Sequence, residues 1–133
     1  MNQNSFSFRV RYAETDQMGV VHHGNYAQYL EMGRIEWLRS IGTSYREMEE
    51  NGIILPVISL QIDYKKSALF DDLLTVETTI KKPPLVKIEF DYKIYNESNE
   101  LLAIAKTVLA FMDKETNRPI KCPDHILEKI DFN

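Results

Sequence analysis

A carboxylate and two adjacent histidines stand close together near the start of the chain. Asp16 is followed by a glycine turn, and His22 and His23 come next, just ahead of a helical pattern. A carboxylate can attack an electrophilic carbon or take a proton from water, and a histidine can exchange protons near neutral pH. Taken alone, Asp16 is more typical of a turn, where its side chain accepts hydrogen bonds from backbone N–H groups two residues on. The segment therefore predicts either a reactive loop or an ordinary turn.

The adjacent histidines also suggest a metal site, which the rest of the sequence does not support. A zinc site needs three or four ligands at characteristic spacings. The other histidine and the one cysteine, His125 and Cys122, lie far along the chain. We therefore expect no metal, and we expect Cys122 to be an inert thiol because no activating signature surrounds it.

Two elements are expected to position this loop. Residues 6–12 alternate between apolar and polar side chains, which predicts a strand with one buried face. From Tyr26 to Ile41 apolar residues recur at spacings of three and four, which predicts an amphipathic helix. Asn25 is a suitable N-cap for this helix, and Gly42 is a suitable stop. A short polar helix is expected next, over Ser44–Asn51.

The remainder of the chain has the pattern of strands. One run, Leu101–Met112, is apolar on both parities, which predicts a central strand covered on both faces. The breaks between runs are short, so we expect the four strands to follow one another as an antiparallel meander. The expected strands are Ile54–Tyr64, Leu74–Ile80, Val86–Ile94 and Leu101–Met112.

One long helix cannot cover both faces of a sheet. The simplest packing is an α+β fold in which a twisted antiparallel sheet curls around the helix. The other face of the sheet then needs a partner, so we expect the protein to form oligomers.

Length and composition set further limits. With 133 residues and 44% hydrophobic content, the chain is expected to form a single globular domain, residues 1–133. The single cysteine and the absence of a signal-peptide pattern suggest a cytoplasmic protein. No apolar run approaches the roughly 20 residues that span a bilayer, so we do not expect an integral membrane protein. A net charge of -4 disfavours binding to nucleic acid.

The segment RYAETDQMGVVHHGNYAQYLEMGRIEWLR, residues 11–39, resembles the opening signature of hotdog-fold acyl-CoA thioesterases of the 4-hydroxybenzoyl-CoA type. It is most similar to the subfamily associated with the Tol-Pal system. FDDLLTVET, residues 70–78, resembles the second landmark of this family. The resemblance implies a hotdog fold, in which a five-stranded antiparallel sheet wraps around one long helix. It also implies a homodimer or a homotetramer built as a dimer of dimers, with composite active sites.

The activity that the resemblance implies is hydrolysis of acyl-CoA to a free acid and CoA, with no cofactor. By position in the motif, the catalytic carboxylate is Asp16, and Tyr12 and His23 accompany it. Because a thioester is already activated, the enzyme needs a nucleophile or base and donors for the oxyanion. Both roles of Asp16 stay open at this point. Backbone amides near His23, Gly24 and Asn25 are the expected oxyanion donors, since a helix start carries unpaired N–H groups and a partial positive charge.

The substrate is expected to lie along the start of the helix. Lysines beside the pocket would hold the phosphates of CoA. In some other hotdog enzymes a carboxylate on the helix is catalytic; here Glu31 is expected instead to pair with Arg34 or to cap a dimer contact. The expected substrate-binding residues are Gly24, Asn25, Tyr26, Lys65 and Lys66.

Two other functions are compatible with the sequence. A hotdog hydratase or dehydratase would act on a carbon–carbon double bond and depend chiefly on His23. A non-catalytic module would bind acyl-CoA or acyl-carrier protein, but such a module gains nothing from Asp16 beside a reactive carbonyl. The identity of the acyl group stays open.

Overall fold

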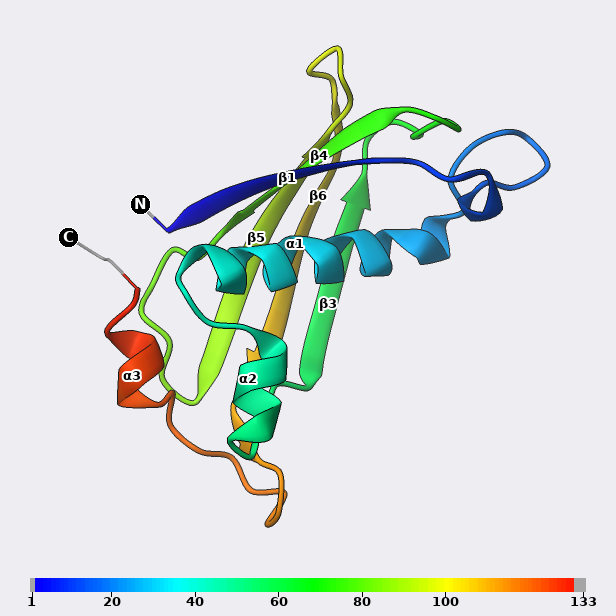
Figure 1. Ribbon diagram of the computed structural model, residues 1–133. Helices are drawn as coiled ribbons and strands as arrows, with labels where there is room; N and C mark the ends of the chain where they lie inside the picture. Colours follow the sequence, from blue (N-terminus) through cyan, green and yellow to red (C-terminus); the bar gives the residue numbers. More distant parts are fainter. Residues whose placement is uncertain (1, 131–133) are drawn as a thin grey trace.

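The computed structural model describes residues 2–130, which form a five-stranded antiparallel sheet around one long helix (Figure 1). The strands are β1 (Gln3–Arg9), β2 (Ile53–Ile54), β3 (Val57–Tyr64), β4 (Leu73–Thr79), β5 (Lys87–Tyr95), β6 (Leu101–Ala110) and β7 (Met112–Asp113). The helices are α1 (Tyr26–Ser40), α2 (Tyr45–Glu50) and α3 (Asp124–Leu127), with two 3-10 turns, η1 (Tyr12–Glu14) and η2 (His23–Asn25).

The order of the strands is β1-β4-β5-β6-β3, so the predicted four-strand meander is wrong in part. Strands β4, β5 and β6 do follow one another, but β3 pairs with β6 at the far edge. Residues 65–72 must therefore cross one end of the sheet to reach β4. This crossing segment is held in place by the loop before α1: the N–H of Val21 donates to the carbonyl of Ala68 at 2.8 Å.

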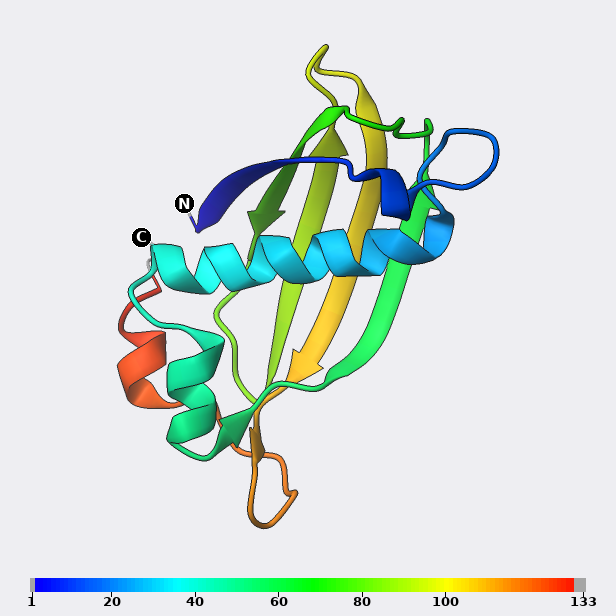
Figure 2. The ribbon, with the colours of Figure 1, turned by 45° about the vertical axis from the view of Figure 1, so that its right-hand side comes forward.

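Helix α1 lies across one face of the sheet, as Figure 2 shows. Tyr29 packs against Phe8 of β1 with ring centres 4.6 Å apart, and Trp37 meets Phe90 of β5 edge-on at 5.3 Å. Both Tyr29 and Trp37 are fully buried. The apolar stripe predicted for this helix thus forms the core with the inner face of the sheet.

The outer face of the sheet is charged. Lys106 of β6 lies 3.8 Å from Glu89 and 3.9 Å from Asp91 of β5, and Lys82 also pairs with Glu89. Ile104 remains 37% exposed among these charges. Strand β6 is central in the sheet, as predicted, but the expectation that both its faces are covered is wrong for this chain alone, because Lys106 and Ile104 reach solvent.

The first strand ends earlier than its apolar pattern predicted. It stops at Arg9 because Val10 turns away to exchange backbone hydrogen bonds with Asp71 and Asp72 at 3.1 and 2.9 Å. Residues 10–25, here named the entry loop, then lead into α1. The short helix α2 agrees with its prediction, and the hydroxyl of Ser44 caps it by accepting from the N–H of Glu47. No helix within residues 2–130 is long and apolar enough to cross a membrane.

Gly33 allows α1 to approach the sheet closely. A methyl group added there would lie 2.7 Å from both Thr78 Oγ1 and Val76 Cγ1. We expect Gly33→Ala to lower the free energy of unfolding by about 1–3 kcal/mol, because α1 or β4 must shift. Urea denaturation measures this change. Gln28→Ala, on the exposed side of the same helix, should stay within about 0.5 kcal/mol of wild type; equal effects of the two substitutions would contradict the packing argument.

Cys122 is 2% exposed, and burial raises the pKa of its thiol to about 11. We expect the folded protein to resist a disulfide reagent such as dithionitrobenzoate at pH 8, because the thiol is both covered and protonated. The released chromophore, followed with and without denaturant, gives the measurement. Rapid stoichiometric reaction in the absence of denaturant would show that this thiol is not inert.

Candidate functional site

One buried carboxylate anchors the entry loop. Glu14 is 6% exposed, and its Oε1 atom accepts hydrogen bonds from the Arg11 backbone N–H at 2.8 Å and from the Tyr29 hydroxyl at 3.0 Å. Its Oε2 atom lies 3.2 Å from the Arg11 guanidinium. Burial, and next the hydrogen bond to Glu14, raise the pKa of Tyr29, so its phenol stays protonated and remains a donor. Since Tyr29 belongs to α1, this contact fixes the loop onto the helix.

The backbone carbonyl of Glu14 fixes the end of the entry loop. It accepts from the N–H of His22 at 3.0 Å and from the side-chain amide of Asn25 at 2.8 Å. Asn25 occupies the N-cap position of α1, but its side chain does not cap the helix, contrary to the prediction. The backbone of Asn25 is already helical, with φ of -81° and ψ of -15°, whereas side-chain capping residues are typically extended.

Asp16 has the geometry of a turn and also lines a cavity. Its Oδ1 atom accepts from the N–H groups of Met18 at 2.8 Å and Val20 at 3.3 Å. The turn closes at Gly19, whose φ of +79° favours glycine. Within residues 2–130 no group donates a hydrogen bond to Oδ2. The carboxylate is thus oriented through one oxygen, while the other is available to a ligand.

The two histidines have different surroundings. The Nδ1 atom of His22 accepts from the N–H of Gly24 at 3.1 Å, and its ring stacks on that of His23 at 4.4 Å. His23 lines the cavity with Asp16. The N–H of Asn25 donates to the His22 carbonyl at 2.9 Å, so two of the three expected oxyanion donors are already engaged. In the described part of the chain, the N–H of His23 has no acceptor and is free to polarise a carbonyl.

The cavity lies between the entry loop, the start of α1 and the crossing segment, and its volume is about 320 Å³. Tyr64, the last residue of β3, borders it, and the Tyr64 hydroxyl donates to the His23 carbonyl at 3.1 Å. Tyr26 is 2% exposed and belongs mostly to the core, where its hydroxyl accepts from the N–H of Ala68 at 3.3 Å. The cavity is lined by Asp16, Val20, Val21, His23, Tyr26, Tyr64, Lys65, Lys66 and Ser67.

Tyr12 lies apart from this group. It is 76% exposed, and its ring meets Phe70 of the crossing segment edge-on at 5.5 Å. It does not line the cavity that contains Asp16 and His23. Of the three expected catalytic residues, one chain therefore brings only Asp16 and His23 together.

Glu31 is tied to Arg34, as predicted. Its Oε2 atom lies 3.9 Å from the Arg34 guanidinium, which also donates to the Tyr45 hydroxyl at 3.3 Å. Arg34, a residue of α1, is buried. Glu31 is itself exposed and does not line the cavity that contains Asp16, so Asp16 is the carboxylate of that cavity.

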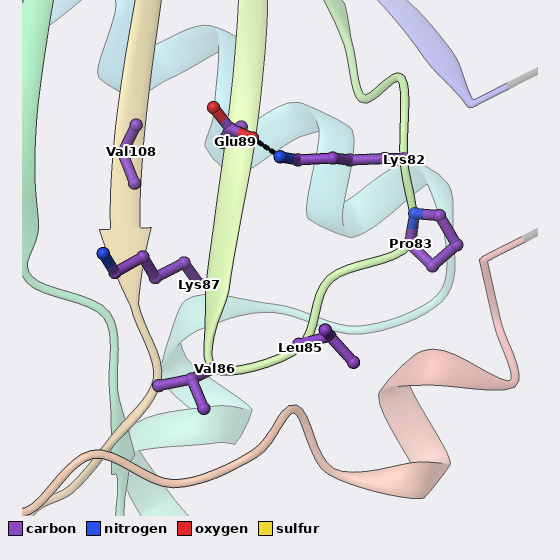
Figure 3. Close-up of a pocket in the computed structure, with 7 residues that line it drawn as sticks. All are labelled: Lys82, Pro83, Leu85, Val86, Lys87, Glu89 and Val108. Atoms are coloured by element: carbon purple, nitrogen blue, oxygen red, sulfur yellow. Dashed lines mark ion pairs between the residues drawn. The ribbon is translucent and has the colours of Figure 1, made fainter.

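A larger hollow of about 590 Å³ lies on the outer face of the sheet, away from the entry loop (Figure 3). Its carboxylate, Glu89, is paired with Lys82, and the hydrogen bond from Lys82 holds the pKa of Glu89 below its ordinary value. No histidine lines the hollow, and the charge of its carboxylate is balanced by Lys82. Size therefore does not identify the reactive site, and the smaller cavity is the candidate. The hollow is lined by Lys82, Pro83, Leu85, Val86, Lys87, Glu89 and Val108.

The chain also matches a known protein family. Residues 10–130 match the family described as the thioesterase-like superfamily. The chain belongs to the thioesterase-like superfamily. This membership and the strand order together confirm the hotdog fold predicted from residues 11–39.

Relatives and solved structures from this superfamily cover nearly the whole chain. YneP of Bacillus subtilis (strain 168) is 37% identical over 121 residues, which are 91% of this chain and 88% of the relative. The acyl-CoA thioesterase YbgC of Haemophilus influenzae is 34% identical over 129 residues, 95% of this chain and 94% of the relative. A DHNA-CoA thioesterase structure from Staphylococcus aureus has a TM-score of 0.86 and 38% identity, covering 90% of this chain and 80% of that one.

Two residues of the site escaped the sequence analysis. Glu14 lies within the motif of residues 11–39, which predicts no role for it, yet its carboxylate organises the entry loop. Tyr64 was assigned only to a strand, although it contacts His23 from a position 41 residues further along the chain. One feature of the sequence favours a role for Glu14, its position three residues after Arg11 in the motif. No local feature of the sequence indicates the role of Tyr64.

Replacing Glu14 should loosen the entry loop. We expect Glu14→Gln to lower the free energy of unfolding by about 1–3 kcal/mol. An amide has one acceptor oxygen, so its NH2 group would face either the Arg11 guanidinium or the Tyr29 hydroxyl, and one of these donors would lose its acceptor. Chemical denaturation tests this. The matched control, Glu36→Gln, breaks an exposed ion pair with Arg39 on α1 and should cost at most about 1 kcal/mol. A smaller loss for Glu14→Gln than for the control would refute the anchoring role.

Proposed function

We propose that this protein hydrolyses acyl-CoA thioesters to a free acid and CoA, with Asp16 as the attacking group or general base. The observation that carries the proposal is a single cavity, at the start of α1, lined by Asp16, His23 and Lys65. This cavity brings together three groups: the carboxylate of Asp16, one oxygen of which accepts no hydrogen bond within residues 2–130, the imidazole of His23 and the ammonium of Lys65. Similarity to the acyl-CoA thioesterase YbgC supports the same reaction.

The reaction follows from the positions of three groups. The carbonyl oxygen of the thioester is polarised by the free N–H of His23 and by the partial positive charge at the start of α1. Oδ2 of Asp16 then attacks the carbonyl carbon to give an acyl anhydride, or it takes a proton from the water that attacks. The bond to sulfur breaks in either case, and the imidazole of His23 is the candidate proton donor to the departing thiolate. On the first route, water then hydrolyses the anhydride, which releases the free acid and restores the Asp16 carboxylate.

The phosphates of CoA are assigned to the lysines of the crossing segment. Lys66 pairs with Glu100, and this ion pair holds the pKa of Glu100 below its ordinary value. Lys65 has no carboxylate partner within residues 2–130. We therefore expect Lys65 to be the first of the two to meet a phosphate, since its charge is not already neutralised.

The exposed edge of the sheet supports the proposed homodimer. Strand β3 lies at this edge, and four of its large apolar residues are 44–50% exposed. An unpaired apolar edge is a site for pairing with another strand. Pairing with a second β3 would place the partner subunit beside the cavity, as a composite site requires. The outer face of the sheet could then join two dimers into a tetramer. The exposed residues are Val57, Ile58, Leu60 and Tyr64.

The finer assignments rest on the sequence motif. Residues 11–39 favour the Tol-Pal-associated group of the family, and the single cysteine favours a cytoplasmic location. The names of the relatives include acyl-CoA in general and the aromatic DHNA-CoA in particular. Both aliphatic and aromatic acyl-CoAs therefore belong in the assay, while thiol release from a saturated acyl-CoA excludes a hydratase.

Removing the charge of Asp16 should abolish turnover while the fold persists. We expect Asp16→Asn to lower kcat on the order of 1,000-fold or more, since an amide neither attacks the thioester nor takes a proton from water. Thiol release across the acyl-CoA panel gives kcat. Asp124→Asn, an exposed acid at the start of α3, is the matched control and should keep wild-type activity. Wild-type turnover by Asp16→Asn would disprove the assignment.

A charge on the edge strand should break the dimer. Leu60→Asp is expected to raise the dissociation constant roughly 30-fold or more, because it buries a carboxylate in the proposed interface. Sedimentation equilibrium measures this, with thiol release assayed on the same samples. Ile104→Asp, on the outer face, should leave the dimer intact. A Leu60→Asp protein that remains dimeric and active would exclude β3 as the interface.

A further inference from the structure

One peptide unit of the entry loop is held from both sides. Its carbonyl, that of His23, accepts from the Tyr64 hydroxyl at 3.1 Å, and its N–H, that of Gly24, donates to His22 Nδ1 at 3.1 Å. Tyr64 makes its contact from the end of β3, and His22 makes its contact from within the entry loop. We infer that Tyr64 and His22 are positioning residues which clamp the His23–Gly24 peptide. This inference rests on the proposed function for its effect on turnover.

Both clamping side chains are themselves supported by packing. The Tyr64 ring meets Tyr26 edge-on at 5.0 Å, and the His22 ring stacks on His23 at 4.4 Å. Because Nδ1 of His22 accepts a hydrogen bond, the neutral ring carries its proton on Nε2. The ring also fills the space beside Gly24: a Cβ at that position would lie 3.0 Å from Nδ1. The clamp therefore has a defined geometry, and a side chain at position 24 would displace the His22 ring by a few tenths of an ångström.

The clamped peptide controls the parts of His23 that face the cavity. The clamp holds the plane of the His23–Gly24 peptide, which includes the Cα of His23, and so fixes the position of that Cα. The imidazole and the free N–H of His23 both extend from this Cα. Catalytic groups must be held to within about 0.5 Å of their productive positions. Loss of the clamp should therefore lower kcat more than it raises KM, because binding of CoA depends on other residues.

Three single variants separate the contributions. Tyr64→Phe removes the donor but keeps the ring, and His22→Ala removes the acceptor. Each should lower kcat roughly 3- to 10-fold, the effect of one neutral hydrogen bond, with KM within about twofold of wild type. His22→Asn should restore kcat, because Asn can accept from the N–H of Gly24 as a capping residue does. Tyr95→Phe, which removes a phenol at the end of β5, is the control and should match wild type.

The double variant tests whether the two residues act on the same peptide. If either loss already frees the peptide, Tyr64→Phe with His22→Ala should lower kcat about as much as the stronger single variant. The Gly24 amide provides a readout in the free protein, through its NMR shift and its hydrogen-exchange rate. Both should change in Tyr64→Phe and in His22→Ala, and His22→Asn should return them to wild-type values.

The outcomes distinguish the clamp from other roles and from the proposed function. Unchanged kcat in either single variant, or a double variant equal to the product of the single effects, would overturn the clamp. A raised KM for Tyr64→Phe with an unaltered Gly24 amide would instead assign Tyr64 to direct substrate contact. If wild type releases thiol from no acyl-CoA, the proposed function is wrong, and the exchange of the Gly24 amide alone decides whether the clamp exists.

Discussion

The buried contact between Glu14 and Tyr29 is the interaction on which the candidate site depends. A carboxylate removed from water is tolerated only where donors surround it, and here Arg11 and Tyr29 supply them. Tyr29 in turn packs on Phe8, so the position of the entry loop is set by the position of α1 on the sheet. Asp16 needs no such burial: it stays exposed, and a turn orients it through only one oxygen. The buried Glu14 thus fixes the loop that presents the exposed Asp16.

The site and the exposed edge of the sheet share one strand. Strand β3 ends at Tyr64, which borders the cavity and contacts His23, and three further apolar side chains of β3 are exposed, those of Val57, Ile58 and Leu60. If the proposed function and the proposed dimer are both right, this one strand couples catalysis to assembly. The hollow on the outer face of the sheet is larger, but neither Asp16 nor a histidine lines it, so it is the weaker candidate for an active site.

Local patterns in the sequence predicted α1, the alternating strand β5 and the loop with Asp16 and His23. The interpretation of Asp16 as a turn residue is confirmed by the hydrogen bond that its side chain accepts from Met18. Its side chain also lines the cavity, and its reactive role stays a prediction. What failed depends on residues distant in sequence. The place of β3 beside β6 follows from the crossing segment, and short breaks between strands carry no information about it. The roles of Glu14 and Tyr64 depend on contacts across 15 and 41 residues, which no spacing rule detects.

The crossing segment has a consequence for how the protein matures. It joins the entry loop through backbone hydrogen bonds from Val21 to Ala68 and from Phe70 to Gly19, and these partners lie far apart in the sequence. Closing such long stretches of chain is entropically slow, so these contacts belong late in folding. A nascent or partly folded chain would therefore have a helix and a sheet before it had a working pocket, and catalytic competence would be a property of the finished fold alone.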